Sequence, residues 1–198
     1  MDEPVTPAPS SEPAAEQVES RAHPPASSAA TISWLRDLMV SVLIAAVVIL
    51  FLYQPVRVEG TSMMPGLIDQ ERIFINKFAY RFGISDIQHG DTVVFWYPGD
   101  PSKSFIKRII GVPGDKVLVK DGQVFVNDVA IDEPYVPGDY RDHVSTPLKA
   151  VPPGEYFVLG DHRSSSNDSR MWGTVPRRYI YGKASFVYWP LDRLGLLR

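Results

Sequence analysis

The sequence contains no cysteine, and this absence removes several kinds of chemistry at once. Without thiols the chain cannot form disulfides, act as a thiol peptidase or hold a cysteine-rich zinc site. The sequence also lacks a large excess of either charge: the net charge is −3 at pH 7, and the excess of negative charge lies in residues 1–31. The near-neutral remainder lacks the basic surface of a nucleic-acid-binding domain, so we expect no nucleic-acid partner.

Large apolar side chains are scarce in residues 1–31, where Pro, Ala, Ser and Glu dominate. A segment of this composition cannot bury enough apolar surface to offset the entropy lost on ordering. We therefore predict that residues 1–31 form a disordered tail.

Charge is absent from Leu38 to Tyr53, where Leu, Ile, Val, Ala and Phe dominate. With the preceding turn from Trp34, this run approaches the ~20 residues that span a bilayer. Trp34 and Tyr53 stand at its ends, as is typical of the headgroup region, and Pro55 disfavours helix at the residue before it. We predict a transmembrane anchor over residues 32–54.

A buried core helix and a cleaved signal peptide are the two alternatives to a membrane anchor for this apolar run. Few helices of small soluble domains are apolar all round, which argues against the core helix. A cleaved signal peptide would not follow a long acidic tail, and the run lacks a small-x-small cleavage site after it. Arginines occur on both sides of the run, so charge alone does not decide which side of a membrane the following domain faces.

After Tyr53 the dominant hydrophobic period is two, which indicates β-strands. The runs are rich in β-branched and aromatic residues and are bounded by turn residues. Asp121-Gly122 between two runs predicts a two-residue type I′ hairpin. Residues 98–101, 134–153 and 160–173 are turn-rich or irregular, so the domain is predicted to be mainly β. The predicted strands cover residues 56–59, 72–76, 92–97, 104–110, 116–120, 123–127, 155–159 and 183–189.

Ser62 is the candidate nucleophile. It lies in Gly60-Thr61-Ser62-Met63-Met64-Pro65, where the proline and the following glycine favour a turn that displays the hydroxyl. Taken alone, such a serine also fits a simple turn or helix cap. The segment is not the Gly-x-Ser-x-Gly elbow of α/β-hydrolases, and the histidines lie in no recognisable triad pattern.

Lys107, within residues 105–110, is the candidate base. Strand alternation places it on the same face as Phe105 and Ile109, which is apolar. Burial there would lower the pKa of the amine, which could then accept the serine proton. The same sequence pattern is also compatible with a lysine at a sheet edge whose ammonium lies in water. Arg108, on the opposite face, is expected to be a surface or structural cation.

Residues 160–173 form a third region of interest, dense in hydroxyls and charges. Its hydroxyls could orient a neutral lysine amine, and Asp168 with Arg170 could brace the loop through charge-assisted hydrogen bonds. A solvated serine-rich turn is the alternative, but an arginine, a methionine and a tryptophan in succession favour an ordered loop. Asp161 and His162 lack a suitably spaced third ligand, so we expect no metal and no cofactor.

Taken together, the segments 60–65, 105–115 and 160–173 resemble the nucleophile, lysine and Gly-Asp-x-Arg to Ser-x-Asp-Ser-Arg-x-Trp-Gly boxes of bacterial type I signal peptidases. The resemblance covers about residues 34 to 190, in the family's order and behind its usual anchor. It implies an antiparallel β-sheet protease domain over residues 55–198, outside the cytoplasm, with the tail inside the cell. The chain would be a single-pass protein of the cell membrane.

The resemblance also implies roles for five residues. Ser62 would attack the scissile carbonyl, and its backbone N–H would be one oxyanion donor. Lys107 would be the general base of both half-reactions, and the Ser166 hydroxyl would orient its amine. Asp168 and Arg170 would hold the loop in place. The partners would be the lipid bilayer and exported preproteins, which are cut after small residues at the first and third positions before the bond.

The sequence departs from the best-known family pattern in four places. Gly60 replaces a serine that supplies a second oxyanion donor in some members, so that donor must be absent or come from elsewhere. Gly66 stands where threonine is frequent. His162 and Ser164-Ser165 replace the more usual Asn and Asp-Asn. None of these changes removes the nucleophile or the base.

Two rival functions remain at this point. Another Ser-Lys protease, such as a self-cleaving repressor-type peptidase, should carry a DNA-binding module where this chain has its apolar run. A membrane-tethered β-domain that binds partners without catalysis would not need both Ser62 and Lys107, and both are present.

Overall fold

The computed structural model describes residues 28–81 and 86–197, which belong to two compact units divided between Leu43 and Ile44. The described part of the first unit is helical and belongs to α1, Ser28–Leu52. An ion pair of 3.0 Å joins the neighbouring side chains Arg36 and Asp37 on its surface. Most of the predicted disordered tail lies outside the described residues, and α1 begins at Ser28, within its last four residues.

The anchor predicted over residues 32–54 is not confirmed by the structure. Over the ranges described, no helix is both long and apolar enough to count as a membrane span. Helix α1 ends at Leu52, and Pro55 lies inside the first strand rather than in a helix stop. The chain therefore changes from helix to strand earlier than the sequence pattern suggested.

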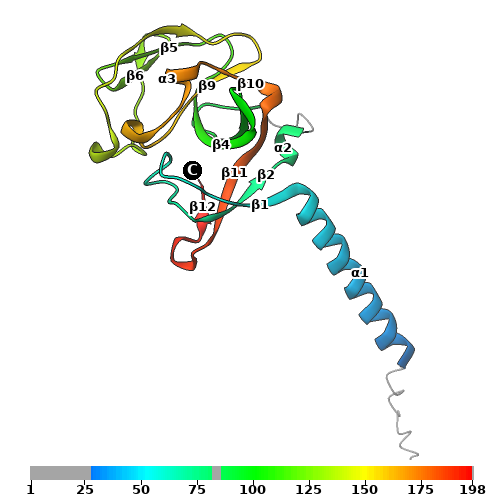
Figure 1. The fold of residues 1–198 in the computed structure, drawn as a ribbon. Helices are drawn as coiled ribbons and strands as arrows, with labels where there is room; N and C mark the ends of the chain where they lie inside the picture. Colours follow the sequence, from blue (N-terminus) through cyan, green and yellow to red (C-terminus); the bar gives the residue numbers. More distant parts are fainter. Residues whose placement is uncertain (1–27, 82–85, 198) are drawn as a thin grey trace, which may run out of the picture. The chain divides into compact units, whose positions relative to one another are not determined.

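The second unit is built from antiparallel strands in two sheets (Figure 1). The larger sheet has the order β1-β2-β11-β3-β4-β9-β10, with β12 beside β11, and the smaller has the order β7-β6-β5-β8. The strands of the larger sheet are β1 Tyr53–Arg57, β2 Arg72–Asn76, β3 Thr92–Tyr97, β4 Asp100–Gly111, β9 Glu155–Leu159, β10 Val175–Pro176, β11 Ile180–Trp189 and β12 Gly195–Leu196. Those of the smaller sheet are β5 Lys116–Lys120, β6 Gln123–Val126, β7 Val129–Ala130 and β8 Thr146–Ala150.

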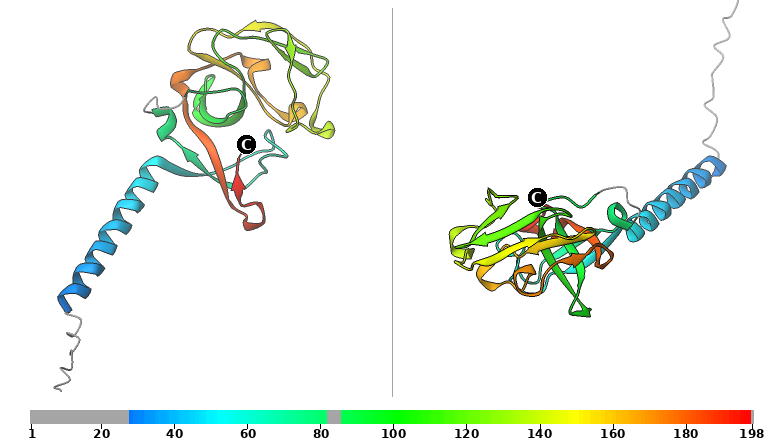
Figure 2. Two further views of the ribbon diagram at one scale, coloured as in Figure 1. Left: turned by 180° about the vertical axis from the view of Figure 1, so that it is seen from behind. Right: turned by 90° about the horizontal axis from the view of Figure 1, so that it is seen from above.

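Short helical segments connect several strands. The α-helical turns are α2 Phe78–Arg81 and α3 Ser169–Trp172. The 3-10 turns are η1 Gly138–Tyr140, η2 Arg163–Ser165, η3 Arg177–Tyr179 and η4 Leu191–Arg193. Strand β4 is strongly curved, and β5 and β6 lie at the opposite end of this unit from β12 (Figure 2).

The structure confirms the mainly β prediction and the hairpin at Asp121-Gly122. Both turn residues have positive φ, of 50° and 78°, as a type I′ turn requires, and Lys120 pairs with Gln123 across them. The prediction of irregular chain over residues 134–153 is wrong in part, because Thr146–Ala150 forms β8 and pairs with β5.

Among the described residues, three clusters of buried side chains form the core. One packs around Phe95 and Ile109 inside the larger sheet, and a second, around Val117 and Phe157, joins the two sheets. The third contains Met63 and other side chains that lie beneath the segment carrying Ser62. Alternation along β4 sends successive residues into different clusters, so one strand ties the segment carrying Ser62 to both sheets.

Candidate active site

Ser62 lies on a turn that is fixed by buried neighbours. Met63 and Leu67 are 2% and 1% exposed, and the Leu67 N–H donates to the Met63 carbonyl at 2.9 Å. The N–H of Gly60 donates to Asp69 Oδ1 at 2.8 Å. Because residues on both sides are held, the half-buried Ser62 side chain projects from a rigid turn. The turn therefore presents the Ser62 hydroxyl as expected.

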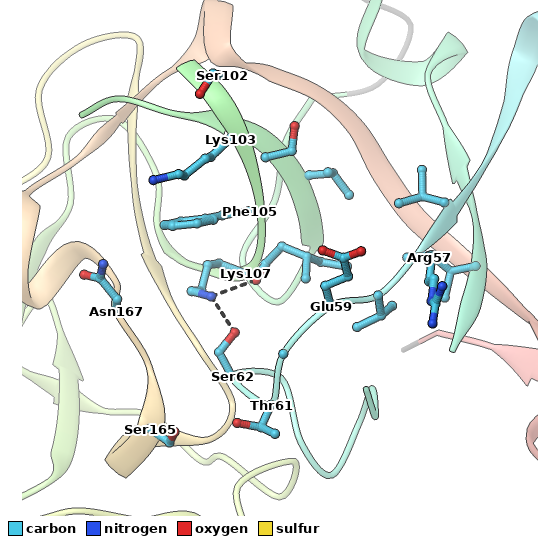
Figure 3. A pocket seen from close by; sticks show the side chains of 17 residues that line it. Arg57, Glu59, Thr61, Ser62, Ser102, Lys103, Phe105, Lys107, Ser165 and Asn167 are labelled. Carbon is cyan, nitrogen blue, oxygen red and sulfur yellow. Dashed lines mark hydrogen bonds between the residues drawn. The ribbon is translucent and has the colours of Figure 1, made fainter. Parts of the chain in front are cut away.

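Lys107 reaches Ser62 from β4. Its Nζ donates to Ser62 Oγ at 2.6 Å and to the Ile106 carbonyl at 3.1 Å. The Phe105 ring centroid is 5.4 Å from Nζ, and Figure 3 shows the lysine side chain between Phe105 and Ser62. The lysine is only 4% exposed, which confirms its prediction on a buried face. The structure thus brings together two side chains that lie far apart in the sequence.

Burial lowers the pKa of Lys107 from 10.5 to about 8. Removal of the ammonium from water is the main cause, and the negative charges of Asp168 and Asp161 partly oppose it. At this pKa a useful fraction of the amine is neutral near physiological pH. A neutral amine accepts a proton, whereas an ammonium only donates hydrogen bonds, so the pair can activate the serine hydroxyl.

The two side chains face a cleft of about 820 Å³. Residues of β1 and the following turn form one wall, and the first half of β4 forms another; Ser165 and Asn167 complete it (Figure 3). A cleft beside a strand suits an extended peptide, which can add to the edge as a further strand.

Asp168 and Arg170 brace the loop that follows β9, and the predicted ion pair is confirmed. Arg170 Nε and Nη2 donate to the two Asp168 carboxylate oxygens at 2.8 and 2.9 Å. Asp168 Oδ2 also accepts from the N–H of Gly160 at 3.1 Å. Arg170 reaches further, to Asp142 at 2.5 Å and to the Arg163 carbonyl at 2.7 Å. These bonds join the loop to β9 and to the segment before β8.

Ser166 lies close to Ser62 but forms no hydrogen bond with Ser62 or Lys107. Its Oγ is buried and has no hydrogen-bond partner in the described part of the chain. A Cβ added at Gly160 would overlap both this Oγ and the carbonyl oxygen of Ser62, which places the three residues in contact range. The structure therefore puts Ser166 at the site without the hydrogen bond to Lys107 that the resemblance implied.

Three further residues at the site were not singled out as site residues from the sequence. The Asp161 carboxylate accepts from Arg108 Nε and Nη2 at 2.9 and 2.7 Å, and both side chains are buried. Their pairing makes Arg108 a structural cation. The N–H of His162 donates to the Ser62 carbonyl at 3.1 Å, which ties the loop after β9 to the nucleophile turn. These contacts join segments far apart in the sequence. The only signal for them in the sequence is the opposite charge of Arg108 and Asp161.

The described residues contain no group of three or more side chains placed to hold a metal ion. The chemistry available is that of a serine hydroxyl, a lysine amine and backbone N–H groups, which is the chemistry of serine hydrolases that use lysine as base.

Comparison with known proteins assigns the family. Residues 31–189 match the family model described as signal peptidase, peptidase S26. The chain is 39% identical over 176 residues to the probable signal peptidase I-2 of Synechocystis, covering 83% of this chain and 78% of that protein. It is 35% identical over 177 residues to signal peptidase IB of Staphylococcus aureus, covering 81% and 91%. A crystal structure of a signal peptidase I from Enterococcus faecalis V583 aligns with a TM-score of 0.45 at 30% identity, covering 51% of this chain and 98% of that one.

The family model and the curated relatives place the chain among the serine peptidases. It belongs to the signal peptidase family, peptidase S26. This family membership excludes the hypothesis that the protein is a self-cleaving repressor-type peptidase.

Proposed function

We propose that this protein is a membrane-bound type I signal peptidase that removes N-terminal signal peptides from exported preproteins. Ser62 is the nucleophile and Lys107 the general base. The observation that carries the proposal is the 2.6 Å contact between Lys107 Nζ and Ser62 Oγ, which opens onto a cleft large enough for an extended peptide.

In the acylation step the neutral Lys107 amine takes the proton of Ser62 Oγ as that oxygen attacks the scissile carbonyl. The tetrahedral adduct collapses when the ammonium returns the proton to the leaving amine, which is the new N-terminus of the mature protein. The signal peptide is then held as an ester on Ser62. Lys107 next takes a proton from a water molecule, which attacks the ester carbonyl. The ammonium returns that proton to Ser62 Oγ as the ester bond breaks, which releases the signal peptide as a carboxylic acid and restores the free serine and the neutral amine.

The N–H of Ser62 is the proposed oxyanion donor. The peptide unit that carries this N–H is held at its other end, because the Thr61 carbonyl accepts from the N–H of Met64 at 3.1 Å. The N–H of Gly60 already donates to Asp69, so we do not assign it as the second donor. A fixed donor needs little reorganisation as negative charge develops on the carbonyl oxygen.

Ser166, Asp168 and Arg170 are proposed as positioning residues. Asp168 and Arg170 fix the loop through their ion pair. The free Ser166 hydroxyl would accept a hydrogen bond from the Lys107 amine once Ser62 Oγ has been acylated, and would then aim the amine at the attacking water. A buried hydroxyl that lacks a partner in one state of a reaction is well suited to gain one in another.

Attachment to the cell membrane is proposed through residues 32–54, with residues 55–198 outside the cytoplasm and the tail inside. The support is the uncharged apolar run from Leu38 to Leu52, which leads into the peptidase domain. Cell fractionation with protease protection tests this. Release of the protein into the supernatant by carbonate would contradict the membrane attachment. Resistance of the domain to protease added to intact spheroplasts would contradict its position outside the cytoplasm.

Cleavage of a purified preprotein in detergent tests the proposed function. Wild type should release the mature protein after a small-x-small sequence, as identified from the mass of the new N-terminus. Ser62→Ala should abolish this cleavage. Ser165→Ala is the matched control, because that serine lines the cleft and has no bond to Lys107. Equal cleavage by Ser62→Ala and wild type would rule out Ser62 as the nucleophile, and no cleavage by wild type would favour a domain that binds without catalysis.

A further inference from the structure

A second cleft, of about 680 Å³, borders the candidate active site, and Ser104 of β4 lines both. We name it the cationic cleft and define it by Lys77, Arg177 and Arg178 together with the rings of Trp96 and Tyr181. Its remaining lining residues are Gln54, Tyr80, Ser104 and Ile180. No carboxylate is among them.

Within the part of the chain that the structure describes, the three cations of this cleft form no ion pair with an acidic side chain. Lys77, Arg177 and Arg178 take part in none of the ion pairs within residues 28–81 and 86–197. Lys77 Nζ lies 5.9 Å from the Tyr181 ring centroid, and the Arg178 guanidinium lies over the ring of Tyr179. Three neighbouring positive charges in a near-neutral domain repel one another, so an anion bound between them would be favoured.

Arg177 is held in place without being neutralised. Its Nη1 donates to the Ile180 carbonyl at 3.1 Å and its Nη2 to the Tyr80 carbonyl at 2.6 Å. The guanidinium also lies 5.4 Å from the Tyr80 ring centroid. Neutral carbonyls and a ring fix its direction but leave its charge in full. A half-buried guanidinium of this kind is preorganised to bind a phosphate.

The aromatic residues of the cleft indicate the kind of anion. Trp96 is 42% exposed, and its ring centroid is 4.9 Å from that of Tyr181. Tryptophan and tyrosine rings beside lysine and arginine are typical of the headgroup layer of a membrane. Gln54 of the lining follows directly after Tyr53, the first residue of β1 after the end of α1. An acidic peptide would satisfy the charges but would give the exposed Trp96 ring, its half-buried neighbour Tyr181 and this position no role.

We propose that the cationic cleft binds the phosphate headgroup of an anionic membrane phospholipid such as phosphatidylglycerol. The inference rests on the proposed membrane attachment, and it adds a lipid class and a site to it. Since Ser104 lines both clefts, a bound lipid holds the catalytic cleft beside the membrane surface, where the cleavage site of a signal peptide emerges. Anionic lipid should then lower the KM for a membrane-embedded preprotein and leave kcat for a short soluble peptide unchanged.

Calorimetric titration of the full chain in a neutral detergent measures the binding directly. The probes are short-chain phosphatidylglycerol, short-chain phosphatidylcholine and inorganic phosphate. We expect phosphatidylglycerol to bind and the other two to bind far more weakly. Lys77→Gln combined with Arg178→Gln should weaken binding about 30-fold, since each cation near an anionic lipid contributes about five-fold.

The matched control is Lys116→Gln combined with Lys120→Gln, which removes the same charge from exposed positions of β5. It should bind phosphatidylglycerol as wild type does. Equal weakening in both double variants would show a general charge effect, and binding of inorganic phosphate as tight as that of the lipid would show a free phosphate site; either result overturns the proposal. So would an acidic peptide that binds the cleft more tightly than the lipid.

Because titration does not depend on cleavage, it separates this inference from the proposed peptidase function. Loss of lipid binding in the Lys77 and Arg178 double variant with normal cleavage of a soluble peptide supports the lipid site alone. Unchanged lipid binding with normal cleavage refutes the lipid site and leaves the peptidase intact.

Discussion

The pH dependence of peptide cleavage tests the state of Lys107. The change in its pKa from 10.5 to about 8 raises the neutral fraction at pH 7 by about 300-fold, to roughly one molecule in eleven. Since only the neutral amine can accept the Ser62 proton, kcat/KM should increase tenfold for each pH unit below pH 8 and level off above it.

Phe105→Ala perturbs this pKa without touching either reacting atom. The Phe105 ring covers the amine, with its centroid 5.4 Å from Nζ. Its removal admits water, which favours the ammonium and should raise the pKa of Lys107 by about 1, so kcat/KM at pH 7 falls about tenfold. The loss should disappear at high pH, where the amine of both enzymes is neutral. Phe105→Leu keeps an apolar cover and should retain most of the wild-type profile.

The assay is cleavage of a short soluble peptide by the full chain in detergent across the pH range, with intact folding checked by circular dichroism at each pH. A uniform loss in Phe105→Ala, with the acid limb at the wild-type position, would show that Phe105 acts through packing alone. A wild-type profile that is flat through pH 8 would refute a titrating lysine base altogether.

Three further changes give separable results. Lys107→Met should raise the free energy of unfolding by up to about 3 kcal/mol below pH 8, because folding of wild type there buries the Lys107 ammonium, and the gain should vanish between pH 8 and 10.5 in denaturant titrations. Gly160→Ala places a methyl group against the Ser62 carbonyl oxygen, so kcat/KM should fall about 100-fold as the nucleophile turn moves. Ser166→Ala removes an unbonded buried hydroxyl, so kcat should fall about tenfold while the thermal midpoint stays level or rises; equal loss of both would contradict a positioning role.

Strands with a clear period of two could be predicted from sequence. Residues 72–76, 92–97, 116–120 and 155–159 were placed at the observed bounds of β2, β3, β5 and β9. Each is rich in β-branched or aromatic residues with a face in the core, so local pattern and tertiary burial agree.

Strand β8 could not be predicted in the same way. Thr146–Ala150 contains Pro147 and has exposed or half-buried side chains throughout, so it carries no hydrophobic alternation. It is a strand because β5 offers backbone partners, with Val117 opposite Lys149. Hydrogen bonding to a strand distant in the sequence therefore stabilises the extended conformation of β8, which its local propensity does not favour.

In the candidate site, too, some features follow from local sequence and others depend on tertiary contacts. Ser62 and Lys107 are candidates from their local patterns, and the family resemblance supports their roles. The apolar face of the lysine follows from strand alternation. Their 2.6 Å contact depends on how the turn after β1 meets β4, which no local pattern encodes. The burial of Arg108 against Asp161 was likewise hidden, because an arginine opposite an apolar face fits a surface position equally well.

The absence of cysteine permits the most direct test of the Ser62–Lys107 pair. Lys107→Cys introduces the chain's only thiol. The variant is alkylated in denaturant with bromoethylamine, which rebuilds an amine of lysine length, or with iodoacetamide, which does not, and is refolded in detergent beside wild type. Preprotein cleavage should be absent in Lys107→Cys, return with the aminoethyl group, and stay absent with the carbamidomethyl group or when Ser62→Ala is also present. Cleavage by unmodified Lys107→Cys at the wild-type rate, or equal recovery with both reagents, would contradict the lysine base.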